Sequence, residues 1–292
     1  MTAAARDRWA EWLAERRFGG DPDHRARLLA KLAETRDRVL DRAELREGET
    51  LLDVGCGEGL IGFGALERGA GTVIFGDIST DLLDFCREAA TELGVLDRCR
   101  FVEASADDLA PIEDGSVDVV TTRSVLIYVK EKPAAFGEFV RVLRPGGRIS
   151  VWEPINRFGS EERRRSGFLG YPAAGLEEVA AKMWAVYEAI QPPDGDPMLD
   201  FDERDLLRLA EAAGFSPIRL TLDARIESVE PRSWDAFLDT AWNPNVPTLR
   251  EAMDEALSPD ERDRFAVQLR PLVERGEGEW RIALAHLSGV RR

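Results

Sequence analysis

Cysteine and histidine are scarce in this chain of 292 residues, which holds three cysteines and two histidines. The cysteines, Cys56, Cys86 and Cys99, lie far apart and do not have the spacing of metal ligands. A sparse and odd number of cysteines is typical of reduced thiols in a cytoplasmic protein. With so few candidate ligands, the sequence argues against a metal site and against a catalytic dyad that uses histidine.

Basic residues are also in deficit, because 39 Lys and Arg stand against 55 Asp and Glu for a net charge of -16. Nucleic acids and anionic membranes both attract basic surfaces, so this charge argues against either as a partner. No run of about 18 apolar residues is present, which excludes a transmembrane helix. Residues 1–12 lack the apolar stretch of a signal peptide. We therefore expect a cytoplasmic protein with neither nucleic acid nor membrane as a partner.

Short apolar runs alternate with amphipathic stretches over much of the chain. The expected strands are 51–54, 73–75, 100–102, 117–120, 148–152, 217–228 and 280–287. The expected helices between the first five strands are 59–68, 80–93 and 132–143. Strands that alternate with helices of about 10–15 residues predict βαβ units and a parallel sheet covered on both faces.

A glycine-rich turn, DVGCGEG at residues 53–59, follows the first expected strand. Glycines let the backbone turn sharply and approach a ligand closely, and the next helix begins with free N–H groups. Asp77 follows the second strand, 22 residues after Gly55. A carboxylate at this place accepts hydrogen bonds from ribose hydroxyls. The turn and Asp77 together predict an adenosine-type ligand at the carboxyl edge of the sheet.

Two families use such a turn, and the residues satisfy both patterns. Residues 57–62, GEGLIG, match the G-x-G-x-x-G of dinucleotide-binding proteins, a weak signal when it stands alone. This match leaves a nicotinamide-dependent oxidoreductase as an alternative. In the other frame, Asp53 stands two residues before Gly55, which resembles motif I of the class I S-adenosylmethionine-dependent methyltransferases. In that family the acid lies near the cationic methionine end of the cofactor, whereas it would repel a pyrophosphate.

The resemblance to these methyltransferases extends over residues 50–153. Residues 76–79, GDIS, are similar to motif II, which implies that Asp77 holds the ribose and that Ile78 packs on the adenine. Residues 114–120 and 143–148 match the entries to the fourth and fifth strands.

Residues 103–109 resemble the loop at the edge of the adenine. Many relatives have Asp where this chain has Ser105, and the Ala106 backbone or Asp107 could serve instead. The resemblance implies S-adenosylmethionine as cofactor and the cofactor-binding residues Asp53, Gly55, Cys56, Gly57, Asp77, Ile78, Ser105, Ala106, Asp107 and Arg123.

The resemblance also implies a fold: an α/β, doubly wound, mostly parallel, seven-stranded Rossmann-like sheet with a last antiparallel strand and helical cap insertions. We expect an N-terminal helical cap over residues 1–44 and a methyltransferase core over 45–156, 200–228 and 278–292. Residues 157–199 and 229–277 are then insertions. Ligands of open α/β sheets bind outside the carboxyl ends of the strands. Because both insertions begin at that edge, we expect them to roof a substrate pocket.

Methyl transfer is an in-line displacement at a sulfonium carbon, so the protein supplies orientation, desolvation and, where needed, a base. Tyr128 and Glu153 follow the fourth and fifth strands and are the expected catalytic residues, with Glu153 as the base if the reaction uses one. An oxygen, nitrogen or carbon acceptor is compatible with the sequence. A protein that kept the cofactor site without catalysis is a further alternative, and the oligomeric state stays open.

Four residues of the insertions and their borders are expected to contact a small-molecule substrate. They are Asn156, Arg157, Tyr171 and Trp242. Arg157 could orient an anionic acceptor. Tyr187 lies on an amphipathic stretch and is expected to be simple packing.

Overall fold

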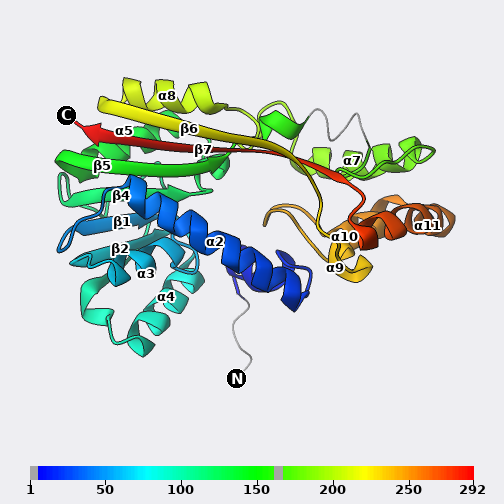
Figure 1. Cartoon of the computed structure of the whole chain (residues 1–292), viewed down its shortest axis with the longest axis horizontal. Coiled ribbons are helices and arrows are strands. Elements are labelled where there is room, and N and C mark those ends of the chain that lie inside the picture. The colour runs from blue at the N-terminus through cyan, green and yellow to red at the C-terminus, as the bar shows by residue number, and fades with distance from the viewer. Residues whose placement is uncertain (1–5, 161–166) are drawn as a thin grey trace. The chain divides into compact units, whose positions relative to one another are not determined.

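The computed structural model describes residues 6–160 and 167–292, apart from the side chains of Asp23, His24, Leu28 and Leu29. The chain divides into two compact units. The sheet unit comprises Ala30–Ile155, Phe201–Asp223 and Leu284–Arg292. The helical unit comprises Met1–Leu29, Asn156–Asp200 and Ala224–Ala283. Figure 1 labels the elements of both units.

The described residues form a seven-stranded sheet with the order β3-β2-β1-β4-β5-β7-β6. The strands are β1 (Thr50–Val54), β2 (Thr72–Asp77), β3 (Cys99–Glu103), β4 (Val117–Arg123), β5 (Leu143–Pro154), β6 (Phe215–Ser228) and β7 (Glu279–Arg291). Strands β1 to β5 pair in parallel, and β7 runs antiparallel to β5. The expected fold class, a mostly parallel sheet with an antiparallel last strand, is confirmed.

Helices cover both faces of this sheet (Figure 1). In the sheet unit they are α3 (Leu60–Glu67), α4 (Thr80–Glu92), α5 (Lys132–Val142) and α8 (Glu203–Ala212), with the 3-10 turns η2 (Leu96–Arg98) and η3 (Leu126–Tyr128). Helices α3 and α4 contact β1, β2 and β3, whereas α5 contacts β5 and α8. Helix α2 (Pro22–Arg42) belongs to the sheet unit from residue 30 onward.

The inner strands are buried on both faces, which explains why they read as continuous apolar runs. Leu51 of β1 and Phe75 of β2 are fully buried and belong to one cluster with Leu40 of α2. The strand order reverses direction between β1 and β4. In open α/β sheets the crevice for a ligand lies at such a point, outside the carboxyl ends of the strands.

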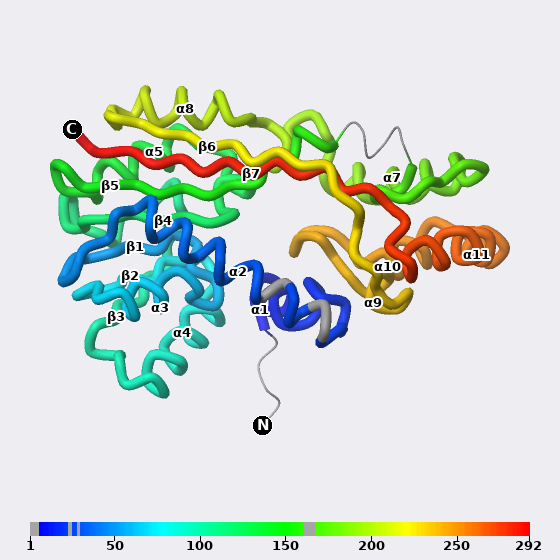
Figure 2. Tube along the Cα trace, in the orientation of Figure 1, coloured from blue at the N-terminus to red at the C-terminus, as the bar shows by residue number. Residues whose placement is uncertain are grey.

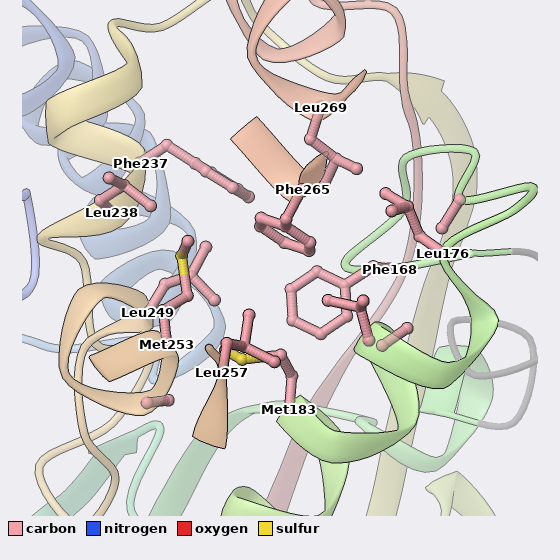
Figure 3. Packing of buried hydrophobic residues seen from close by; sticks show 14 of the residues in the cluster. Phe168, Leu176, Met183, Phe237, Leu238, Leu249, Met253, Leu257, Phe265 and Leu269 are labelled. Atoms are coloured by element: carbon pink, nitrogen blue, oxygen red, sulfur yellow. The ribbon is translucent and has the colours of Figure 1, made fainter. Parts of the chain in front are cut away.

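The helical unit has an aromatic core of its own. Its helices are α1 (Arg8–Glu11), the π-helix η1 (Trp12–Arg16), α7 (Glu177–Ile190), α9 (Trp234–Leu238), α10 (Leu249–Ala256) and α11 (Pro259–Arg275). In Figure 3 the rings of Phe168 and Phe265 point toward each other. Their centroids are 5.4 Å apart with the planes at 80°, an edge-to-face pair. The buried core therefore consists of residues from 168–273.

The chain passes between the units several times, as its path in Figure 2 shows. Strand β6 leaves the sheet unit at residue 224, and β7 enters it at residue 284. No helix among residues 6–160 and 167–292 is long and apolar enough to cross a membrane. The boundaries expected for the cap, core and insertions, and the roofing of a pocket by 157–199 and 229–277, stay predictions.

Candidate functional site

The glycine-rich turn that follows β1 has a backbone conformation that favours glycine. Gly55, Gly57 and Gly59 have φ values of 64°, 55° and 79°, in the left-handed region. A Cβ on Gly55 would lie 2.4 Å from Cγ2 of Val125, and one on Gly59 would lie 2.5 Å from Cε2 of Phe63. Both the conformation and the close neighbours therefore require glycine in this turn.

Asp77, at the end of β2, ties the glycine-rich turn to the neighbouring strand. Its Oδ2 accepts a hydrogen bond from the backbone N–H of Gly57 at 2.9 Å, and its Oδ1 accepts one from Ser79 at 3.0 Å. The carboxylate thus shapes the turn and the start of α4 together. Asp77 also stands at the position where the sequence predicts a contact with ribose.

Two further predicted contacts lie at the same edge. Ile78 is 48% exposed although it is large and apolar, and it directly follows Asp77. Ala106 is buried, and the Ser105 hydroxyl donates to Oδ1 of Asp107. Ser105 and Asp107 are therefore joined to each other, in a turn closed by the bond from Asp108 N–H to Ser105 C=O at 3.0 Å.

Asp53 lies inside the sheet unit beneath the turn and is 2% exposed. Its Oδ2 accepts from the N–H of Gly62 at 3.0 Å, and its Oδ1 accepts from the hydroxyl of Thr121 at 3.1 Å. Burial raises the pKa of Asp53 to about 7, against the opposing effects of these bonds and of the Arg123 charge. Asp53 therefore joins β1, β4 and α3, and its charge changes near neutral pH.

Arg123 ends β4 and provides a positive charge at this point of the sheet. Burial lowers the pKa of Arg123, and the negative charge of Asp53 acts most strongly against this shift, followed by Glu153 and Tyr128. Tyr128 ends the short turn η3 that follows β4. The edge between β1 and β4 therefore gathers two carboxyl groups, a guanidinium and a phenol.

Glu153, near the end of β5, is fully buried and engaged by the backbone. Its Oε1 accepts from the N–H groups of Val125 at 2.9 Å and Leu126 at 3.1 Å, and its Oε2 accepts from Ile127 at 3.4 Å. Burial raises the pKa of Glu153 to about 7, and these bonds oppose the shift. The carboxyl group thus anchors the segment that carries Tyr128, a task that the sequence did not reveal.

Cys56 lies within the glycine-rich turn and is buried. Its N–H donates to the Gly76 carbonyl at 3.0 Å. The adjacent Cys86 thiol and burial raise the pKa of Cys56 well above its usual range. A raised pKa is the opposite of what activates a thiol, so the surroundings of Cys56 do not favour a nucleophilic role.

The residues expected to contact substrate fall in the helical unit, where two of them meet. Asn156 and Trp242 line one cavity of about 290 Å³. Tyr171 and Arg157 are not among the described residues that line it. Tyr171 is buried instead against Phe237, with ring centroids 5.6 Å apart at 84°. The described residues that line it are Asn156, Ser160, Leu169, Trp184, Tyr187, Glu188, Gln191, Asp196, Met198, Leu199, Trp242 and Trp280.

The sequence analysis did not predict the contribution of α7 to this cavity. Trp184, Tyr187 and Gln191 occupy positions i, i+3 and i+7, which lie on one face of a helix. This spacing was visible in the sequence. Tyr187 does pack, with its ring centroid 4.2 Å from that of Trp242, but it also lines the cavity. Among the described residues, no group of three or more His, Cys, Asp or Glu could hold a metal ion.

The part of the chain that contains the glycine-rich turn is similar to known proteins. Residues 52–151 match the model of a family described as methyltransferase domain. The chain is 36% identical over 117 residues to the ubiquinone/menaquinone biosynthesis C-methyltransferase UbiE of Citrobacter koseri. That match covers 39% of this chain and 46% of the relative, so the chain spans about half the length of the curated relatives it matches.

Solved structures resemble the chain over most of its length. The YcgJ protein of Bacillus subtilis matches with a TM-score of 0.57 and 18% identity, over 89% of this chain and 98% of that one. A geranyl diphosphate C-methyltransferase of Streptomyces coelicolor, solved with S-adenosyl-L-homocysteine, matches with a TM-score of 0.53 and 19% identity, over 95% and 85%. At these identities the likeness establishes the fold.

Proposed function

We propose that this chain, whose residues 52–151 match the family described as methyltransferase domain, is a class I S-adenosylmethionine-dependent methyltransferase. It transfers a methyl group from S-adenosylmethionine to a small-molecule acceptor. The observation that carries this proposal is the glycine-rich turn bonded to Asp77 beside the exposed side chain of Ile78. The family match spans this turn, and it favours the methyltransferase frame of the glycines over the dinucleotide frame.

The chemistry of the edge fits an adenosyl cofactor. A buried carboxylate at the end of β2 is an acceptor for ribose hydroxyls, and an exposed apolar side chain next to it offers a surface for the adenine ring. We propose that Asp77 and Ile78 have these roles. The backbone of Ala106, together with the Ser105–Asp107 pair, is the proposed contact of the adenine edge.

When bound, S-adenosylmethionine supplies an electrophilic methyl group on its sulfonium. We propose that Asp53, Gly55, Cys56 and Gly57 surround its methionine end, with Arg123 balancing the local charge. Asp53 is suited to a cation because its carboxyl group is buried beside the turn and loses its proton near pH 7. The Gly62 N–H and the Thr121 hydroxyl hold this carboxyl group in one position, and such preorganisation favours catalysis by orientation.

We propose a positioning role for Glu153 in place of the base role. Its two oxygens accept three backbone N–H groups from the segment 125–127, so this carboxyl group determines where η3 begins. Tyr128 ends that turn and is the proposed residue to face the acceptor. Because a carboxylate or phenolate acceptor needs no base, this arrangement is compatible with methyl transfer.

The acceptor class is proposed as a small organic molecule with an oxygen, nitrogen or carbon nucleophile. The two methyltransferases above are named for ubiquinone and menaquinone biosynthesis and for geranyl diphosphate, which supports small-molecule acceptors. Asn156, Arg157, Tyr171 and Trp242 stay the proposed substrate contacts. A cytoplasmic location and the absence of nucleic-acid partners stay predictions from the acidic composition.

The proposal is tested with the full chain and S-adenosylmethionine that carries a labelled methyl group. We expect S-adenosylhomocysteine to bind in a calorimeter, NADH and NADPH to leave no binding heat, and label to enter a product from a broad acceptor panel. If a dinucleotide binds and S-adenosylhomocysteine does not, the chain is a nicotinamide-dependent oxidoreductase instead. Tight cofactor binding without label transfer to any acceptor would instead favour the non-catalytic relative.

A further inference from the structure

Arg123 is the last residue of β4 and lies at the carboxyl edge of the sheet. Strands β1 and β4 are neighbours (Figure 1), and Asp53 pairs with Thr121 across them. Side chains alternate between the faces of a strand, so Arg123 lies on the face of Thr121, whose hydroxyl donates to Oδ1 of Asp53. Two residues of a strand span about 7 Å. Arg123 therefore stands beyond Asp53, where the glycine-rich turn follows β1.

The guanidinium of Arg123 has no bonded partner among the residues that the structure describes. Neither a hydrogen bond nor an ion pair joins it to any of them, and its neighbours act on it through their charges alone. Arg123 is half-buried. Its nitrogens are not among the side-chain atoms that are both inaccessible and unbonded, so each of them keeps some accessible surface. The group is therefore within reach of a ligand.

The carboxyl groups nearest to Arg123 are bonded to other groups. Both oxygens of Asp53 accept hydrogen bonds, from Gly62 and Thr121, and both oxygens of Glu153 accept backbone N–H groups. A guanidinium carries five N–H donors in a planar fork and stays charged in proteins. Burying part of such a cation without a partner costs free energy. An unbonded fork at this edge therefore indicates a site for an anionic group of a ligand.

The charges around Arg123 match an α-amino acid. Among the neighbouring charges, that of Asp53 acts most strongly on the guanidinium. A guanidinium fork binds a carboxylate through two parallel N–H bonds, and a carboxylate beside it attracts an ammonium. The methionine end of S-adenosylmethionine carries both of these groups. An acceptor with a negative charge alone fits the pair less well, because Asp53 would repel it.

We propose that the Arg123 guanidinium binds the α-carboxylate of S-adenosylmethionine through two N–H groups, with the ammonium on the side of Asp53. The proposal rests on the proposed function and gives Arg123 a task beyond the balance of local charge. A residue that only balances charge would be replaceable by lysine, whereas a bidentate contact needs the guanidinium fork. The protein should then distinguish the cofactor from an analogue that lacks the carboxylate.

Calorimetry on the full chain with two matched ligands tests this binding mode. S-adenosylhomocysteine carries the carboxylate, and S-adenosyl-3-thiopropylamine keeps the adenosine, thioether and amino group without it. At pH 8 and about 0.15 M salt, Asp53 is largely ionised and long-range charge effects are screened. We expect the analogue to bind about 10- to 100-fold more weakly. Equal affinities would overturn the proposal, and this comparison needs no variant.

Variants of Arg123 show whether this residue causes the difference. Arg123→Gln removes the charge and the fork, so the two ligands should lose most of their difference in affinity. Both ligands carry the amino group, so an altered Asp53 affects them alike. Arg123→Lys keeps the charge without the fork and should restore part of the difference. A wild-type difference that persists in Arg123→Gln would contradict the proposal.

Arg208→Gln is the matched control, because the Arg208 side chain is 69% exposed on α8 and pairs with Asp205 on the same helix. It removes the same charge away from the turn and should keep the wild-type difference between the ligands. If Arg208→Gln lost this difference as Arg123→Gln does, net charge rather than a contact would explain it, and the proposal would be wrong.

The two ligands also separate a failure of this assignment from a failure of the proposed function. If S-adenosylhomocysteine and the analogue bind equally well, the cofactor site stands and the role of Arg123 is wrong. If neither ligand binds, the proposed function is wrong and the assignment fails with it. Unchanged binding of both ligands to Arg123→Gln, with slower methyl transfer, would place Arg123 at the acceptor and would also overturn the proposal.

Discussion

The two units of the chain differ in whether all of their buried polar side chains are hydrogen-bonded. In the sheet unit, the carboxyl groups of Asp53, Asp77 and Glu153 all accept hydrogen bonds from backbone N–H groups. Among the described residues, the three buried side-chain atoms without a partner all lie in the helical unit, on Trp184, Tyr187 and Arg232. The buried carboxyl groups at the edge of the sheet are therefore bonded by the protein itself, whereas the helical unit leaves these three atoms unbonded among the described residues.

Of the variants that test this comparison, Glu153→Ala should have the largest effect, a loss of unfolding free energy. Glu153→Ala leaves three buried N–H groups of residues 125–127 without an acceptor, and we expect the free energy of unfolding to fall by about 3–5 kcal/mol. Urea unfolding measures this change. The control is Glu88→Ala on the exposed side of α4, which should stay within about 0.5 kcal/mol of the wild type. Similar stabilities of the two variants would contradict the anchoring role of Glu153.

Asp77→Ala should lower cofactor affinity by about 1.5–3 kcal/mol, which is roughly 10- to 150-fold. The variant removes the proposed partner of the ribose and also frees the N–H of Gly57. Calorimetry with S-adenosylhomocysteine measures the loss. Asp84→Ala is the matched control, because Asp84 pairs with Arg87 on the surface of α4. An affinity that is unchanged in a folded Asp77→Ala protein would leave Asp77 with a structural role alone, through its bonds to Gly57 and Ser79.

Acid should weaken binding of the cationic cofactor. Burial raises the pKa of Asp53 to about 7, so the free protein holds a proton there below pH 7 and must release it to offer a negative charge to the sulfonium. We expect S-adenosylmethionine to bind roughly tenfold more weakly at pH 6 than at pH 8, since ionisation of a group with this pKa changes by that factor. S-adenosylhomocysteine lacks the sulfonium and should depend less on pH. Asp53→Asn should remove the difference between the two ligands.

Removing one hydroxyl group from each unit should change the free energy of unfolding least. The two variants compare the units directly. Thr121→Val removes the hydroxyl that donates to Asp53, which should cost about 1–2 kcal/mol of unfolding free energy. Tyr187→Phe removes a hydroxyl without a described partner and should cost nothing. Urea unfolding of both variants checks the contrast. Equal losses would contradict the difference between the bonded hydroxyl of Thr121 and the unbonded hydroxyl of Tyr187.

The sheet and its glycine-rich turn were predictable because their signals are local. Buried parallel strands read as apolar runs, and the left-handed φ of Gly55 and Gly59 demands glycine wherever the turn occurs. The spacing from Gly55 to Asp77 then follows from one βαβ unit. The class of fold and the place of the cofactor edge therefore needed no long-range information.

The roles of Glu153 and Tyr187 were not predictable in the same way. Glu153 reaches residues 125–127, 26–28 positions earlier, through the pairing of β4 with β5. Tyr187 meets Trp242 across 55 positions that include a separate strand, β6. From sequence alone, a carboxylate at a strand end suggests a catalytic base, and a tyrosine on an amphipathic helix suggests a core residue. Only the structure shows which residues they contact.

Hydrogen exchange with and without S-adenosylhomocysteine tests the central claim, that the adenosyl cofactor binds on the carboxyl edge of the sheet. The account predicts slower exchange in residues 53–60, 77–80 and 105–107, where the turn, Asp77 and the Ser105 loop lie. Residues 240–247 of the helical unit should keep their rate until an acceptor binds. Protection of 240–247 with no change at the three edge segments would contradict the account.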